Sequence, residues 1–133
     1  MTQVRTKPRT PTPRQAARRK APVDRLLDPA FFKALCDPTR ARMVACLVKC
    51  GVPCTVSAIA GCCDVDLSVV SRHLKILETG GVLSKIKKGR EVVYTVRADD
   101  LAHRLRALAA EIEVGCAGCG CPGTGSKTGC CPA

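Results

Sequence analysis

The chain has 133 residues, a formal net charge of +11, eleven cysteines and only three aromatic residues. Its length suits one compact domain with tails. No apolar run reaches the ~18 residues of a membrane-spanning helix, and the N-terminus lacks the apolar block of a secretory signal. Three aromatic side chains are too few to stack successive bases, which disfavours a binder of single-stranded nucleic acid. In a chain that is not exported, an odd number of cysteines indicates metal or redox chemistry rather than a disulfide framework.

Residues 1–22 are predicted to be a disordered basic arm. They hold seven basic residues, no acidic residue and four prolines, which oppose helix formation. Such an arm can contact phosphates, or it can be a solvated tail without a role. A transit peptide is disfavoured, because the prolines would interrupt its amphipathic helix.

A domain over residues 23–114 is predicted to be mainly helical. Apolar residues spaced three and four apart indicate helices over residues 26–35, 40–49, 56–62 and 67–78. Asp37, Thr55 and Asp66 are expected to cap the last three of them. Pro29 is expected to split the first, and Gly80-Gly81 to end the fourth.

The hydrophobic period changes from 3.6 to 2 after Gly81. Strands are therefore expected over residues 82–86 and 91–97, joined by a turn at 87–90. Asp99 or Asp100 should cap a last helix that runs to Ile112, and residues 115–133 should form a flexible tail rich in cysteine and glycine. Helices followed by a charged hairpin are typical of a winged helix-turn-helix, a mainly α fold with a small β-hairpin.

Five short motifs carry a resemblance to a known family. They are Leu-Cys-Asp-Pro-Thr-Arg at 35–40, Val-Ser-Arg-His-Leu-Lys-Ile-Leu at 70–77, Gly-Gly-Val-Leu at 80–83, Gly-Arg at 89–90 and Val-Tyr at 93–94. Together they resemble the ArsR/SmtB family of metal-responsive repressors, from about residue 29 to residue 112. The resemblance implies a homodimer that binds double-stranded operator DNA, not an enzyme, without membrane contact, in the bacterial cytoplasm at the nucleoid.

The helix over 67–78 is interpreted as the element that reads DNA. With Val70, Leu74 and Leu77 buried, its other side should face the major groove, and the basic hairpin should act as a wing. His73 has two readings, a packed residue or a phosphate contact. The predicted DNA-binding residues are Leu67, Ser68, Val69, Ser71, Arg72, His73, Lys75, Lys87, Lys88 and Arg90.

In the family, the end helices form the dimer interface. Here that implies an interface built from Phe31, Phe32, Leu101, Leu105, Leu108 and Ile112. Some of these side chains are also expected in the core of the single chain.

The resemblance also implies an inducing ion, but two ligand patterns of the family are missing. The arsenic-sensing Cys-x-Cys pair falls on Thr55 and Ser57, which are hydroxyls. The zinc pattern of the last helix fails because Asp100 and His103 are misspaced and no second histidine is present there.

The remaining thiols suggest a thiophilic inducer, arsenic(III) or antimony(III), ahead of zinc or cadmium. The first choice of ligands is the cluster Cys116, Cys119 and Cys121, and the second is Cys62 and Cys63 with Cys54. Cys36 and Cys46 are interpreted as small core residues.

Two other functions remain open at this point. A thiol redox or reactive-sulfur sensor could use the same scaffold through a dithiol-to-disulfide switch. A small enzyme or a metal-storage protein is disfavoured, because neither needs a DNA-reading helix.

Overall fold

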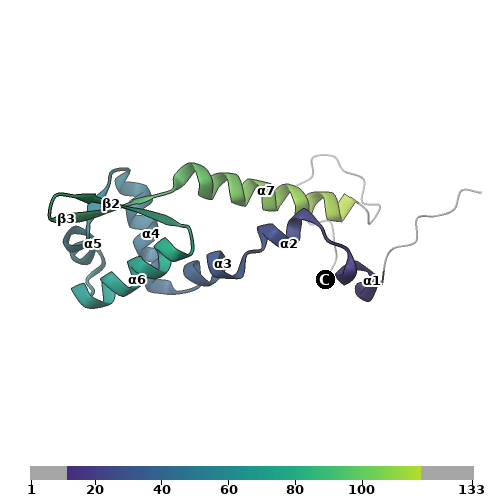
Figure 1. Ribbon diagram of the computed structural model, residues 1–133, viewed down its shortest axis with the longest axis horizontal. Helices are drawn as coiled ribbons and strands as arrows, with labels where there is room; N and C mark the ends of the chain where they lie inside the picture. Colours follow the sequence, from purple (N-terminus) through teal and green to yellow (C-terminus); the bar gives the residue numbers. More distant parts are fainter. Residues whose placement is uncertain (1–11, 118–133) are drawn as a thin grey trace, which may run out of the picture. The chain divides into compact units, whose positions relative to one another are not determined.

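The computed structural model describes residues 12–117, and side chains within residues 12–114. Its elements are α1 (Pro13–Arg18), α2 (Pro22–Leu26), α3 (Pro29–Leu35), α4 (Pro38–Cys50), β1 (Cys54–Thr55), α5 (Val56–Cys63), α6 (Leu67–Thr79), β2 (Leu83–Lys88), β3 (Glu91–Val96) and α7 (Ala98–Ala117) (Figure 1). One compact unit spans Leu27–Leu105, and a second holds α1, α2 and α7 from Arg106 onward. Within residues 12–117, no helix is both long and apolar enough to cross a membrane.

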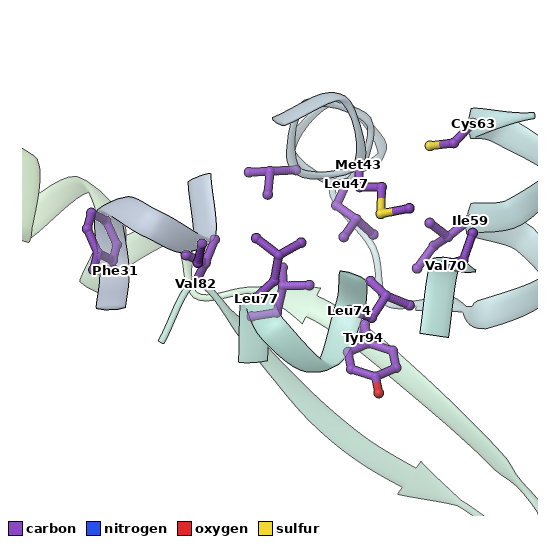
Figure 2. Packing of buried hydrophobic residues seen from close by; sticks show 13 residues of the cluster. Phe31, Met43, Leu47, Ile59, Cys63, Val70, Leu74, Leu77, Val82 and Tyr94 are labelled. Carbon is purple, nitrogen blue, oxygen red and sulfur yellow. The ribbon is translucent and has the colours of Figure 1, made fainter. Parts of the chain in front are cut away.

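Helices α4, α5 and α6 enclose the core of the Leu27–Leu105 unit. Figure 2 shows side chains of all three helices pointing toward one another, with Tyr94 of β3 at one edge. The largest fully buried side chains are Phe31, Met43, Ile59, Leu74, Leu77, Leu83, Val70 and Val82. Burying a side chain of this size contributes about 1.5–3 kcal/mol, so these contacts hold the helices in fixed positions.

The helix starts follow the predicted capping residues. Asp37 accepts a hydrogen bond from the amide of Arg40 at 3.0 Å, and Thr55 accepts one from Ala58 at 3.2 Å. Asp66 occupies the N-cap of α6, as predicted, but its side chain makes no capping hydrogen bond. Each satisfied cap contributes about 1 kcal/mol, which explains why short apolar segments form helices here.

Gly80 and Gly81 end α6, as the glycine pair predicts. Gly81 has a φ of +80°, and its amide donates to the carbonyl of Glu78 at 3.0 Å. The amide of Val82 reaches back to Leu77 at 3.0 Å, and both of these side chains are buried. This is a Schellman ending, which directs the chain from α6 into β2.

A three-stranded antiparallel sheet follows, in the order β1-β3-β2. The hairpin of β2 and β3 was predicted, with Lys85 opposite Tyr94 and Gly89 in its turn at a φ of +62°. The predicted turn at 87–90 is too long, because Lys87 and Lys88 still pair with β3. The short strand β1 was not predicted. Cys54 pairs with Tyr94 and Thr55 with Val93, and two residues are too few for an alternating pattern to be visible.

Three further sequence expectations at the ends of elements are wrong. Prolines do not keep the basic arm free of helix, because Pro13 is tolerated in the first turn of α1 and Thr12 forms a capping box with Gln15. Helix α7 starts at Ala98, so Asp99 and Asp100 lie in its first turn instead of capping it. It also continues to Ala117, three residues into the predicted tail.

Candidate nucleic-acid interface and thiol groups

Helix α6 presents one polar, exposed side to solvent. Val70, Leu74 and Leu77 are fully buried, as predicted, and this fixes the rotation of the helix. The side chains of Leu67, Ser68, Ser71, Arg72 and Lys75 are exposed, whereas Val69 and His73 are half-buried. Arginine and serine can donate to base edges and phosphates. The exposed side of α6 therefore carries the donors that a major-groove helix requires.

The hairpin adds positive charge next to this helix in the fold. Lys87 and Lys88 at the end of β2 and Arg90 in the turn are all exposed. Lys85 forms an ion pair with Glu78 of α6 at 3.5 Å, which links the two elements. Among residues 12–114, the other three cations have no acidic partner within 4 Å, so their charge is available to phosphates.

His73 contacts Arg40, the last residue of the Leu-Cys-Asp-Pro-Thr-Arg motif at 35–40. A guanidinium nitrogen of Arg40 lies 3.3 Å from Nδ1 of His73. Because a guanidinium can only donate, a hydrogen bond between the two groups uses Nδ1 as the acceptor. The interpretation of His73 as a packed residue is therefore supported by its contact with Arg40. The histidine is half-buried on α6.

Arg40 also closes the end of α3. Its Nε donates to the carbonyl of Ala34 at 2.6 Å, and another guanidinium nitrogen donates to Lys33 at 3.2 Å. The amide of Arg40 and its nearby positive charge lower the pKa of the Asp37 carboxyl. One side chain thus joins α3, α4 and α6, which are far apart in sequence.

The residues predicted for a dimer interface are not equally available to a partner. Phe31 is 1% exposed, packs edge-to-face on Phe32 at 5.1 Å and lies under the guanidinium of Arg104. It belongs to the core of the single chain. Leu105 and Ile112 are 45% and 52% exposed, Leu108 is buried, and Leu101 is half-buried.

The predicted thiol ligands are only partly described. The first choice, Cys116, Cys119 and Cys121, lies outside the residues whose side chains are described. In the second choice, Cys62 is exposed, Cys63 is buried in the core and Cys54 is half-buried. Within residues 12–114, no three His, Cys, Asp or Glu side chains converge closely enough to hold a metal ion. The structure therefore does not gather the second choice into one site.

The interpretation of Cys36 as a core residue is wrong. It is exposed, because it lies at the junction between α3 and α4 rather than on a buried helix side. Cys46 is half-buried and, unlike an isolated core residue, has other thiols as neighbours.

Five cysteines follow one another along α4, β1 and α5, and we call them the thiol row: Cys46, Cys50, Cys54, Cys62 and Cys63. The sulfurs of Cys50 and Cys54 are 3.5 Å apart. Cys46, Cys62 and Cys63 line a surface pocket of about 310 Å³, together with Arg42 and Lys49. A hydrogen bond with Cys62 and burial raise the pKa of Cys46, while burial and Cys50 raise that of Cys54 to about 11.

Sequence reasoning missed the thiol row as a group. The signal that could have found it is the spacing of Cys46 and Cys50, since side chains four residues apart share one side of a helix. The contribution of β1 and α5 comes from tertiary packing, which the spacing does not reveal.

Known proteins share this architecture. Residues 35–86 match a family model described as a helix-turn-helix domain. The arsenic resistance transcriptional regulator ArsR1 of Pseudomonas putida KT2440 is 34% identical over 74 residues, which are 56% of this chain. The match spans 57% of that relative's own length, a little over half.

Two solved structures extend the likeness. The crystal structure of a possible transcriptional regulator for arsenical resistance is 30% identical, with a TM-score of 0.53, over 62% of this chain and 83% of the other. A homodimeric winged helix-turn-helix DNA-binding domain from Mycobacterium bovis, a possible ArsR-family regulator solved by NMR, is 25% identical, with a TM-score of 0.54, over 79% of this chain and 89% of the other. The exposed helix α6, the basic hairpin and these matches agree: the chain belongs to the ArsR family of winged helix-turn-helix transcriptional regulators, which bind DNA and are not enzymes.

Proposed function

We propose that the chain is a homodimeric repressor that releases its operator when a thiophilic metalloid binds its cysteine thiols. The observation that carries the DNA-binding half is the exposed side of α6, where Arg72 and Lys75 stand clear of the buried stripe. In a two-fold dimer, two such helices reach half-sites about 34 Å apart, one turn of DNA. The homodimeric M. bovis neighbour supports this arrangement, and the exposed Leu105 and Ile112 of α7 offer apolar surface to a partner copy.

The inducer is proposed from the chemistry of the side chains. Eleven cysteines in 133 residues provide many soft ligands, and thiolates prefer soft ions. Two of the similar proteins have arsenic in their names. Arsenite is therefore the first candidate, followed by antimonite, with zinc and cadmium behind them. Cys116, Cys119 and Cys121 remain the first proposed ligands.

The test is a DNA-binding titration with the reduced protein and the DNA upstream of its own gene. We expect nanomolar to micromolar binding and release by arsenite. Arg72→Ala should weaken binding of the operator by about 1–3 kcal/mol, because Arg72 lies on the exposed side of α6. Arg42→Ala is the matched control, since Arg42 is exposed on α4 and should leave binding unchanged.

The outcomes separate the two candidate functions. Release by arsenite that a dithiol chelator reverses supports the metalloid-responsive repressor. Release by peroxide alone, reversed by dithiothreitol, would instead identify a thiol redox sensor. Equal affinity of the Arg72→Ala variant and the Arg42→Ala control would contradict the proposed role of α6.

A further inference from the structure

Cys50 and Cys54 form a close pair of thiols, with their sulfurs 3.5 Å apart. Cys50 is the last residue of α4, and Cys54 is the first residue of β1. The intervening turn begins at Gly51, whose φ of +70° is a left-handed conformation that glycine adopts readily. This turn brings the two sulfurs to 3.5 Å. The pair is thus positioned by backbone conformation rather than by chance contact of long side chains.

The distance between the sulfurs discriminates between classes of ion. Two bonds of about 2.3 Å, the length of a zinc–thiolate bond, would meet at an angle of roughly 100° across 3.5 Å. A pyramidal trivalent ion accepts such an angle. A linear two-coordinate ion would need its two sulfurs roughly 4.6 Å apart, twice that bond length. The pair therefore fits a bent site better than a linear one.

A third thiol is available one helical turn away. Cys46 lies four residues before Cys50 on α4, so both side chains emerge from the same side of the helix, with Cβ atoms about 5–6 Å apart. In the structure, Cys46 neighbours Cys62 in the pocket beside Lys49. A change of its side-chain rotamer would turn its sulfur toward Cys50. This change is part of the proposal, because the three sulfurs do not converge in the structure.

We propose that Cys46, Cys50 and Cys54 form a binding site for trivalent arsenic or antimony where α4 meets β1. The inducer class rests on the proposed function, but these ligands are separate from the cysteines of residues 116–131. The reaction is a ligand exchange without a change of oxidation state. Each sulfur forms a bond to arsenic and displaces one hydroxyl of As(OH)₃, and each thiol proton leaves with that hydroxyl as water. Three thiols thus yield a neutral As(SR)₃ and three waters.

The exchange involves only neutral species, which suits the half-buried position of Cys46 and Cys54. Because reactants and product are all neutral, the site gains no net charge on binding, and burying an uncompensated charge is costly. Divalent zinc with three thiolates would leave a charged complex. The site is therefore expected to prefer arsenous acid to zinc.

The site is also connected to the elements that contact DNA. Cys54 pairs with Tyr94 of β3, which continues the hairpin, and Thr55 pairs with Val93. The side chain of Thr55 caps α5, the helix that precedes α6. A shift of Cys54 toward α4 would therefore move β1, which pairs with β3 of the hairpin, and would also move Thr55, which caps α5.

Direct arsenite binding tests this proposal without DNA. The starting protein is the full chain with Cys116, Cys119, Cys121, Cys130 and Cys131 replaced by serine, reduced with a phosphine. Native mass spectrometry and near-ultraviolet thiolate absorbance should show one arsenic per chain. Adding Cys50→Ser should raise the apparent dissociation constant by at least about 10-fold, since even an outer-shell partner of a bound metal is worth about 10–100-fold. Cys50 is exposed, so this variant should fold.

Cys54→Ser is the second variant, and Cys36→Ser is the control. Cys36 is exposed between α3 and α4, outside the thiol row, and its replacement should leave arsenite binding unchanged. Failure of the starting protein to bind arsenic, or unchanged binding after Cys50→Ser and Cys54→Ser, overturns the proposal. A disulfide between Cys50 and Cys54 in place of the adduct, seen as a loss of two hydrogens, also overturns it. If the starting protein forms the adduct but the unsubstituted chain stays on DNA in arsenite, the site is supported and the proposed function is contradicted instead.

Discussion

Arg40 makes contacts that join three helices, and its place in a sequence motif does not explain them. Its guanidinium contacts the last carbonyls of α3 and the ring of His73 on α6, while its amide is held by Asp37. Sequence reasoning identified the stretch from Asp37 to Arg40 and the helix start within it. It could not predict the acceptors of Arg40, because they lie on segments that only the tertiary structure brings near.

Loss of the Arg40 side chain should therefore destabilise the fold. Arg40→Ala leaves the carbonyl of Ala34 without this donor in a part-buried position and removes an exposed hydrogen bond to Lys33. We expect a loss of about 1–3 kcal/mol in the free energy of unfolding, measured by urea denaturation. Arg42→Ala, which removes an exposed arginine from the same helix, should change it by less than about 0.5 kcal/mol. Equal losses in the two variants would show that the contacts of Arg40 contribute nothing.

At the scale of elements, the sequence predicts most of what the structure contains. Helix α6 and the hairpin are predictable because each has a clear hydrophobic period and a glycine at its boundary. Helix α1 was missed because proline can start a helix as well as break one. Strand β1 was missed because its two residues are defined only by their partners on β3. Sequence patterns therefore predict elements with a long hydrophobic period, and they miss a short strand that is defined only by its pairing with another strand.

The end of α6 provides an element-scale prediction, because it approaches α3 very closely. A Cβ on Gly80 would lie 2.6 Å from the Cβ of Ala34 and 3.1 Å from the carbonyl of Ala30. Gly80→Ala must therefore push α6 away from α3, and we expect a loss of about 1–3 kcal/mol in the free energy of unfolding.

Gly61→Ala is the matched control for this substitution. Gly61 lies within α5, and nothing lies within 4 Å of an added Cβ there. Since alanine favours a helix over glycine by about 1 kcal/mol, this variant should gain stability. Thermal unfolding of both variants checks the pair. A Gly80→Ala variant as stable as the parent would show that α3 and α6 can separate without cost.

In the whole molecule, the proposed function depends on groups of residues from several elements, which no single sequence pattern connects. The exposed side of α6 could be predicted because burial of one stripe determines the other. The thiol row could be predicted only in part, from the spacing of Cys46 and Cys50 on α4, because Cys54 and Cys62 belong to other elements. Spacing along the chain describes one element at a time, whereas a binding site is assembled from several.

The distribution of charge leads to a prediction about the whole molecule. Among residues 12–20, Arg14, Arg18, Arg19 and Lys20 are all exposed, with no acidic residue between them, in a chain of net charge +11. If the α1 cations contact phosphates, each contact adds about 0.9 to the slope of log affinity against log salt concentration. The triple variant Arg14→Ala, Arg18→Ala and Arg19→Ala should therefore lower that slope by up to about 3 and weaken binding to all DNA sequences alike.

Fluorescence anisotropy over a series of salt concentrations measures this slope on operator and on unrelated DNA. The charge-matched control replaces Arg25, Lys49 and Arg106, which are exposed outside α1, α6 and the hairpin. Because both variants lose three positive charges, a general reduction in long-range attraction would affect them equally. A larger drop in slope for the α1 variant identifies phosphate contacts by α1. The same slope in both variants would mean that these cations are only solvated, and that α6 and the hairpin carry the electrostatic part of DNA binding.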